Sequence, residues 1–91
     1  MTPTNSAEVV IKLFDKARMM GIPCRVESSL IKRSDSRYLI LHPGQPNEAI
    51  IRVSSHAPYE NRYSLCLDIH RPHLLESAVE VGSQWMEEHY G

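Results

Sequence analysis

Five residues in the second half of the chain have side chains suited to acid–base chemistry: Arg52, Ser54, His56, Asp68 and His70. Arg52 and Ser54 are two positions apart, as are Asp68 and His70, so each pair shares one face if its segment is a β-strand. If the two strands are neighbours, Arg52 and Asp68 can pair across them, which is worth about 0.2–1 kcal/mol. Such a cluster can perform general acid–base catalysis on a phosphodiester. The alternative, which we favour, is a polar sheet face that keeps the protein soluble.

Other catalytic interpretations of the same region are weaker. Asp68, His70 and His73 are close in sequence, but their spacing matches no standard metal site and neither cysteine assists, so we expect no metal and no cofactor. Ser54, His56 and Asp68 have the residue types of a serine-hydrolase triad, yet the chain contains no Gly-x-Ser-x-Gly nucleophile elbow. We therefore assign no catalytic residue and favour a binding protein over an enzyme.

A local cluster of basic residues precedes the centre of the chain and consists of Arg25, Lys32, Arg33 and Arg37. With Tyr38 beside it, this cluster is suited to contact an RNA or DNA backbone. The alternative is a solvated connection between strands, in which Asp35 reduces the charge. The whole chain has 10 basic and 11 acidic side chains and a net charge of -1. This balance argues against broad, salt-dependent binding to nucleic acids.

Two helices at the ends of the sequence frame these residues. The first begins at Asn5, whose side chain can cap the backbone at Glu8, and ends where Gly21 and Pro23 stop its apolar periodicity. The second begins near Pro72, a residue favoured in the first turn of a helix. Its apolar stripe comprises Leu74, Leu75, Ala78, Val81, Gly82, Trp85 and Met86.

Strand patterns fill the region between the helices, at residues 24–30, 36–41, 49–56 and 62–69. The centre is a hairpin over residues 36–56, whose turn is rich in Pro and Gly. Its apolar face carries Leu39, Leu41, Ala49, Ile51 and Val53, and its other face carries Tyr38, His42, Arg52 and Ser54. In the last strand, Tyr63, Leu65, Leu67 and Ile69 share one face. We predict an α+β fold: a two-layer sandwich of helix, three or four antiparallel strands and helix, with both helices on one sheet face.

The length and composition indicate one small domain over residues 1–91, with residues 1–4 as a frayed start. Cys24 and Cys66 are expected on different sheet faces, which argues against a disulfide. The chain shows no signal peptide and no apolar run long enough to span a bilayer, so we expect a soluble cytoplasmic protein.

The chain resembles two groups of proteins. Ser36-Arg37-Tyr38, followed by Ile51-Arg52-Val53-Ser54-x-His56, is similar to a pattern in small uncharacterised proteins of phages and other mobile elements. This resemblance implies that the matching positions are Arg37, Tyr38, Arg52, Ser54 and His56. The order of elements also resembles HicA-type toxins, small ribonucleases with a double-stranded-RNA-binding-like fold. Where that family has a catalytic Gly-Ser-His run, this chain has Asp35-Ser36-Arg37.

Together these features favour a non-enzymatic binding protein of a phage or mobile element, for which an anti-defence (anti-CRISPR-like) inhibitor is one form. The expected contact surface is the polar sheet face with the loop at residues 54–61. It comprises Arg37, Tyr38, Arg52, Ser54, His56, Tyr59, Asp68 and His70. The expected partner is a host protein complex or a second copy, since Ile40 and Ile50 lie away from the predicted helices. The alternative is an RNA-binding or HicA-like ribonuclease protein. We expect no membrane partner.

Overall fold

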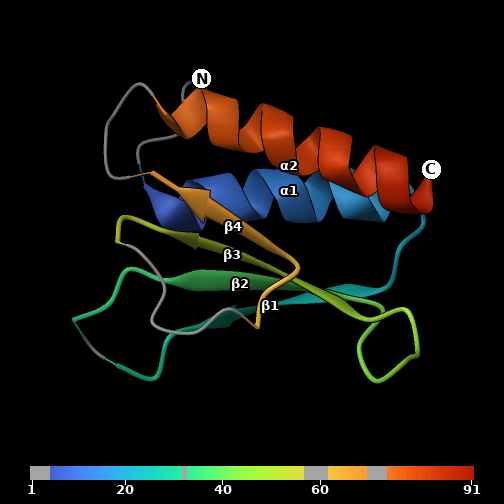
Figure 1. Cartoon of the computed structure of the whole chain (residues 1–91), viewed down its shortest axis with the longest axis horizontal. Coiled ribbons are helices and arrows are strands. Elements are labelled where there is room, and N and C mark those ends of the chain that lie inside the picture. Colours follow the sequence, from blue (N-terminus) through green and yellow to red (C-terminus); the bar gives the residue numbers. More distant parts are fainter. Residues whose placement is uncertain (1–4, 32, 57–61, 70–73) are drawn as a thin grey trace.

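The computed structural model describes residues 5–31, 33–56, 62–69 and 74–91, and the predicted frayed start at residues 1–4 lies outside them. Two helices lie side by side on one face of a four-stranded sheet (Figure 1). The elements in chain order are α1 (Ser6–Met19), β1 (Cys24–Ser28), β2 (Arg37–Leu41), β3 (Ala49–Ser54), β4 (Leu65–Asp68) and α2 (Leu74–Tyr90). The predicted two-layer α+β fold is confirmed.

The ends of α1 follow the local sequence signals. The side chain of Asn5 accepts a hydrogen bond of 3.0 Å from the backbone N–H of Glu8, which satisfies a donor that has no partner inside the helix. After the helix, Gly21 takes a φ of 76°, a conformation that glycine adopts without steric cost. These two residues fix where α1 ends and β1 begins.

The sheet has the order β1-β2-β3-β4 and is mixed rather than fully antiparallel. The predicted hairpin is present, since β2 and β3 are antiparallel with Leu39 opposite Ile51. The prediction that all strands are antiparallel is wrong for β4, which pairs with β3 in parallel, with Ile51 opposite Leu65. A parallel neighbour requires a connection long enough to return to the start of the previous strand.

Cys24 and Cys66 lie on the two edge strands, β1 and β4, with two strands between them. Because neighbouring strands are about 4.8 Å apart, these thiols are too far apart for an intramolecular disulfide. Both are free thiols. Within the described residues, neither α1 nor α2 combines the length and apolarity that a bilayer crossing requires.

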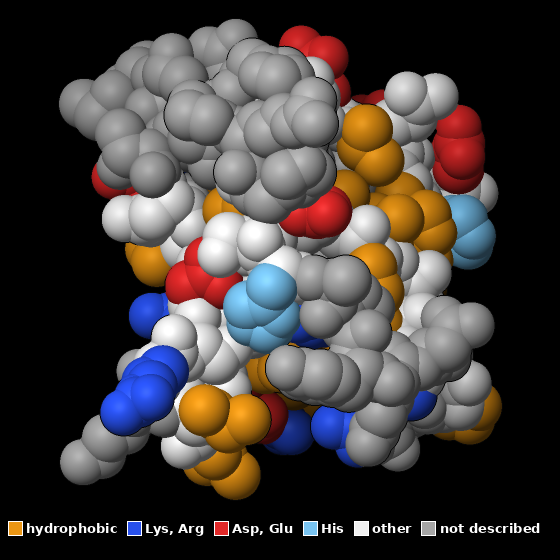
Figure 2. All heavy atoms as spheres, turned by 60° about the vertical axis from the view of Figure 1, so that its left-hand side comes forward, with side chains coloured by type: hydrophobic (Ala, Val, Ile, Leu, Met, Phe, Trp, Pro, Cys, Tyr) orange, Lys and Arg blue, Asp and Glu red, His pale blue; other side chains and the backbone are white. Residues whose placement is uncertain are grey.

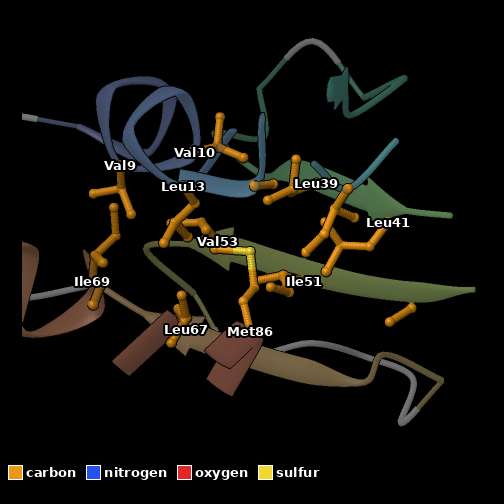
Figure 3. Close-up of a cluster of buried hydrophobic side chains, with 14 residues drawn as sticks. Val9, Val10, Leu13, Leu39, Leu41, Ile51, Val53, Leu67, Ile69 and Met86 are labelled. Atoms are coloured by element: carbon orange, nitrogen blue, oxygen red, sulfur yellow. The ribbon is translucent and has the colours of Figure 1, made fainter. Parts of the chain in front are cut away.

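The hydrophobic core lies between the helices and the sheet. Leu13 of α1, Ile51 and Val53 of β3 and Met86 of α2 are completely buried and point toward one another (Figure 3). The period of two in β2 and β3 places their odd-numbered apolar residues on this side. Leu67 and Ile69 extend the same core from the last strand. The predicted apolar face of the hairpin is therefore the face that the helices cover.

Gly82 of α2 sits directly against Leu13 of α1. A Cβ atom at Gly82 would lie 2.7 Å from Cδ2 of Leu13, which is closer than carbon atoms approach without displacement. Leu13 is fully buried and has little room to move. The missing side chain at Gly82 thus allows the two helices to share one layer.

We expect Leu13→Ala to lower the free energy of unfolding by about 2–5 kcal/mol, because it leaves a cavity in the core. Adding Gly82→Ala to Leu13→Ala should recover part of this loss, since the new methyl group has space and alanine favours a helix by about 1 kcal/mol. In the wild type, Gly82→Ala should instead destabilise by overpacking. Urea unfolding of the wild type, the two single variants and the double variant measures whether the effect of Gly82→Ala on stability changes sign when Leu13 is truncated.

Ile11→Ala is the matched control, because Ile11 lies on the exposed side of the same helix. It should cost less than about 1 kcal/mol. If Gly82→Ala had the same effect with and without Leu13, the close packing of the helices would be contradicted.

Candidate functional site

The open face of the sheet, which is the face away from the helices, carries three cross-strand pairs between β2 and β3. They are Ile40 with Ile50, Tyr38 with Arg52, and Ser36 with Ser54. The series therefore runs from an apolar pair, through an aromatic and a cationic residue, to two hydroxyls. Ile40 is only 5% exposed although it is outside the core between helices and sheet, so the open face has burial of its own.

Arg52 is buried, with only 4% of its surface exposed. Its Nη2 donates to Oγ of Ser36 at 3.2 Å and lies 3.3 Å from Nδ1 of His56, while Nη1 donates to the carbonyl of His56 at 3.1 Å. The guanidinium carbon is 5.8 Å from the ring centre of Tyr63. Arg52 is thus held below the surface by neutral acceptors, rather than extended into solvent as a polar sheet face would have it.

A chain of hydroxyl groups connects this arginine to a carboxylate. Ser34 Oγ donates to Ser36 Oγ at 2.9 Å, Ser36 Oγ donates to Ser54 Oγ at 3.0 Å, and Ser54 Oγ donates to Oδ1 of Asp35 at 3.0 Å. Each hydroxyl donates once, so the direction of the whole chain is set by the carboxylate at its end. Ser36 and Ser54 are buried, and this chain gives their hydroxyls partners.

Asp35 joins three parts of the molecule. Both of its carboxylate oxygens accept from the backbone N–H of Ser55, at 3.2 and 3.1 Å, and its own carbonyl accepts from Oγ of Ser6 in α1. Burial by itself raises the pKa of Asp35, but hydrogen bonds from Ser55 and Ser54 and the nearby His56 outweigh it and bring the pKa below its usual value. The structure therefore favours the ionised carboxylate.

The ring of His56 is held between a donor and an acceptor. Because a guanidinium can only donate, the contact of Arg52 with Nδ1 makes this nitrogen the acceptor, and the proton of a neutral ring is on Nε2. Nε2 lies 3.2 Å from Oγ of Ser34 and 3.9 Å from Oδ1 of Asp35, where an N–H can be donated. In this arrangement the ring bridges Arg52 and the hydroxyl of Ser34.

A pocket of about 560 Å³ opens on this face. Tyr38, Ile40 and Ile50 contribute apolar surface, and Arg52 and Tyr63 stand beside them. The rings of Tyr38 and Tyr63 are stacked, with centres 5.6 Å apart. The pocket has the size and the mainly apolar lining of a binding site.

The loop between β1 and β2 forms one wall of the pocket with Leu30 and Ile31. Leu30 is 100% exposed and Ile31 is 66% exposed, which is unusual for two consecutive large aliphatic residues. Figure 2 looks at the end of the molecule that is on the left in Figure 1, and basic and hydrophobic side chains are exposed together on its lower part. This combination is typical of a surface that contacts a partner.

The structure brings together only part of the predicted contact surface. Tyr38, Arg52, Ser54 and His56 lie together on the open face. Arg37 is opposite Val53, so its position belongs to the helix-covered side. Asp68 of β4 is opposite Ser54, and Cys66 rather than Asp68 is opposite Arg52, so the predicted cross-strand pair of Arg52 with Asp68 is wrong.

Other predicted positions lie outside the described residues, namely Tyr59, His70 and His73. Among the residues that are described, no three His, Cys, Asp or Glu side chains are placed to hold a metal ion.

Sequence reasoning missed the residues that organise the site: Ser34, Asp35, Ser36 and Tyr63. From the sequence, Asp35 is expected only to reduce the charge of a basic cluster. Tyr63 is expected on the apolar face with Leu65, but it precedes β4 and turns to Tyr38 instead. The available signal is the short run Ser34-Asp35-Ser36, because these residue types often bond to nearby backbone and side-chain groups in turns.

We expect Asp35→Asn to lower the stability at pH 7 by about 1 kcal/mol, a charged hydrogen-bond contribution reduced for solvent exposure. The folded-state pKa of Asp35 is lowered, so its contribution is present above the unfolded pKa and is lost as the pH falls through the folded pKa. The difference between wild type and variant should therefore shrink below about pH 4. Urea unfolding from pH 7 to pH 3 measures it.

Asp15→Asn, at an exposed position of α1, is the matched control and should change stability by less than about 0.5 kcal/mol. An Asp35→Asn variant as stable as the wild type at pH 7 would contradict the role of the carboxylate.

Comparison with known proteins gives no relative from which a function can be transferred. The chain matches no protein-family model, no curated protein and no solved structure. The function must therefore be inferred from the geometry of the open face.

Proposed function

We propose that this chain is a non-enzymatic binding protein and that the open face, with its pocket and the β1–β2 loop, contacts a protein partner. The observation that carries the proposal is the pair of exposed aliphatic residues, Leu30 and Ile31, at the wall of an apolar pocket. Exposing such side chains to water is unfavourable by about 25 cal/mol per Å² of apolar surface, and a docked partner removes this cost.

The chemistry of this surface favours a protein over RNA. Aliphatic side chains such as Leu30 and Ile31 offer no ring on which a base can stack. Tyr38 and Tyr63 stack on each other, so each ring has one face already occupied. Aromatic residues and arginine around an apolar pocket are instead the usual anchors of protein interfaces.

A foreign protein is also favoured over a second copy of the chain. In a symmetric dimer the same surface contacts itself, so an interface formed by this face would contain two copies of the Arg52 charge. Like charges in a desolvated contact oppose association. A host protein complex therefore remains the proposed partner, and an inhibitor of host defence, encoded by a phage or mobile element, remains the proposed biological setting.

The test is co-purification of the tagged chain from a bacterial host, with bound protein and RNA both analysed. We expect a stoichiometric protein with the wild type and its loss, by at least about tenfold, with Leu30→Asp/Ile31→Asp. These side chains are exposed, so the fold should be unaffected. Met19→Asp, which is 86% exposed at the end of α1, is the matched control and should retain the partner.

Two results would contradict the proposal. Enrichment of RNA whose binding falls steeply with salt would support the RNA-binding alternative. A dimer that the double variant dissociates in sedimentation experiments would make the partner a second copy.

A further inference from the structure

Arg52 is a buried cation, and among the described residues no carboxylate lies within ion-pair distance of its guanidinium. Its bonds go to Oγ of Ser36 and to the carbonyl and Nδ1 of His56, none of which carries a negative charge. The ionised Asp35 is connected to it indirectly, through the hydroxyls of Ser36 and Ser54 and through the ring of His56. A buried charge is costly unless an opposite charge compensates for it.

The same guanidinium retains capacity to donate toward the pocket. It has five N–H groups, and its contacts with Ser36 and His56 use only Nη1 and Nη2. Within the described part of the chain, no buried side-chain nitrogen or oxygen lacks a hydrogen-bond partner. Nε makes none of these bonds and is therefore not fully buried, and Arg52 lines the pocket.

Apolar surface lies next to this cation. Ile50 is two residues from Arg52 on the same strand face, and Ile40 is opposite Ile50. The ring of Tyr63 also lies near the guanidinium, with its centre 5.8 Å from the guanidinium carbon. A ligand that fills the pocket can therefore contact the positive charge of Arg52 and the aliphatic side chains of Ile40 and Ile50 at the same time.

We propose that the pocket binds an acidic segment of the protein partner, in which one carboxylate side chain reaches Arg52 and an adjacent aliphatic side chain packs on Ile40 and Ile50. This inference rests on the proposed function and adds the chemistry of the partner. Charge complementarity carries it: the described lining contains the carboxylate of Glu27, but Glu27 is already paired with Arg25 at 2.9 Å. Among the described lining residues no carboxylate is then left for Arg52, and in our proposal the partner supplies it.

The test uses two defined peptides, acetyl-Leu-Glu-Leu-amide and acetyl-Leu-Gln-Leu-amide, titrated into the ¹⁵N-labelled chain at pH 7. The expected result is shifts of the resonances of Ile50, Arg52 and Tyr63 with the glutamate peptide, and at least about tenfold weaker binding of the glutamine peptide. The Arg52→Gln variant should bind both peptides equally. Arg25→Gln, which removes an exposed arginine of the same face, should keep the preference.

The alternative outcomes separate this inference from the proposed function. If both peptides bind the pocket of the wild type equally, the carboxylate anchor is wrong and the protein-binding surface stands. If 4-methylpentanoate binds as tightly as the glutamate peptide, the ligand is a small acid and both proposals fail. If only an oligouridylate shifts these resonances, both fail in favour of RNA. Because the peptide comparison uses the wild type, the result does not depend on whether Arg52→Gln folds.

Discussion

The hydrogen bond from Ser54 to the carboxylate of Asp35 is the interaction on which the open face depends. Three serine hydroxyls donate in sequence, and such a chain needs a final acceptor that carries no proton of its own. An ionised carboxylate meets this requirement. Asp35 also accepts from Ser6 in α1 and from Ser55 after β3. One residue therefore connects the helix layer, the β1–β2 loop and the end of the central strand.

This arrangement explains how Arg52 is buried on a sheet face that no helix covers. Its planar guanidinium reaches Ser36 and two atoms of His56 at once, which the single ammonium group of a lysine does not reproduce. The positions of both partners are set by the serine chain. The orientation of His56 follows in turn, because the arginine fixes Nδ1 as an acceptor. The site is thus arranged to hold a positive charge in place.

The sequence was sufficient to predict the layers of the fold but not the details of the site. Alternation of apolar residues in β2 and β3 identified the side that packs on the helices, because a strand period of two is a direct consequence of backbone geometry. The direction of β4 is set by its pairing with β3, a contact between distant segments that a local pattern does not encode. The burial of Arg52 was not predictable from a local pattern either, because it depends on contacts with Ser36, His56 and Tyr63 from other segments. Asp35 escaped prediction because the groups that donate to it are brought together only by the fold.

The two faces of the sheet differ in what they contribute. The helix-covered face buries Leu13, Ile51, Val53 and Met86 and supplies most of the hydrophobic stabilisation. The open face buries a charge and several hydroxyls, which add little net stability because their desolvation offsets their hydrogen bonds. A small domain that carries such a network next to exposed Leu30 and Ile31 gives up stability that an apolar replacement would supply. This loss is understandable if the network orients Arg52 for a partner, because a preorganised cation loses little entropy when a carboxylate binds.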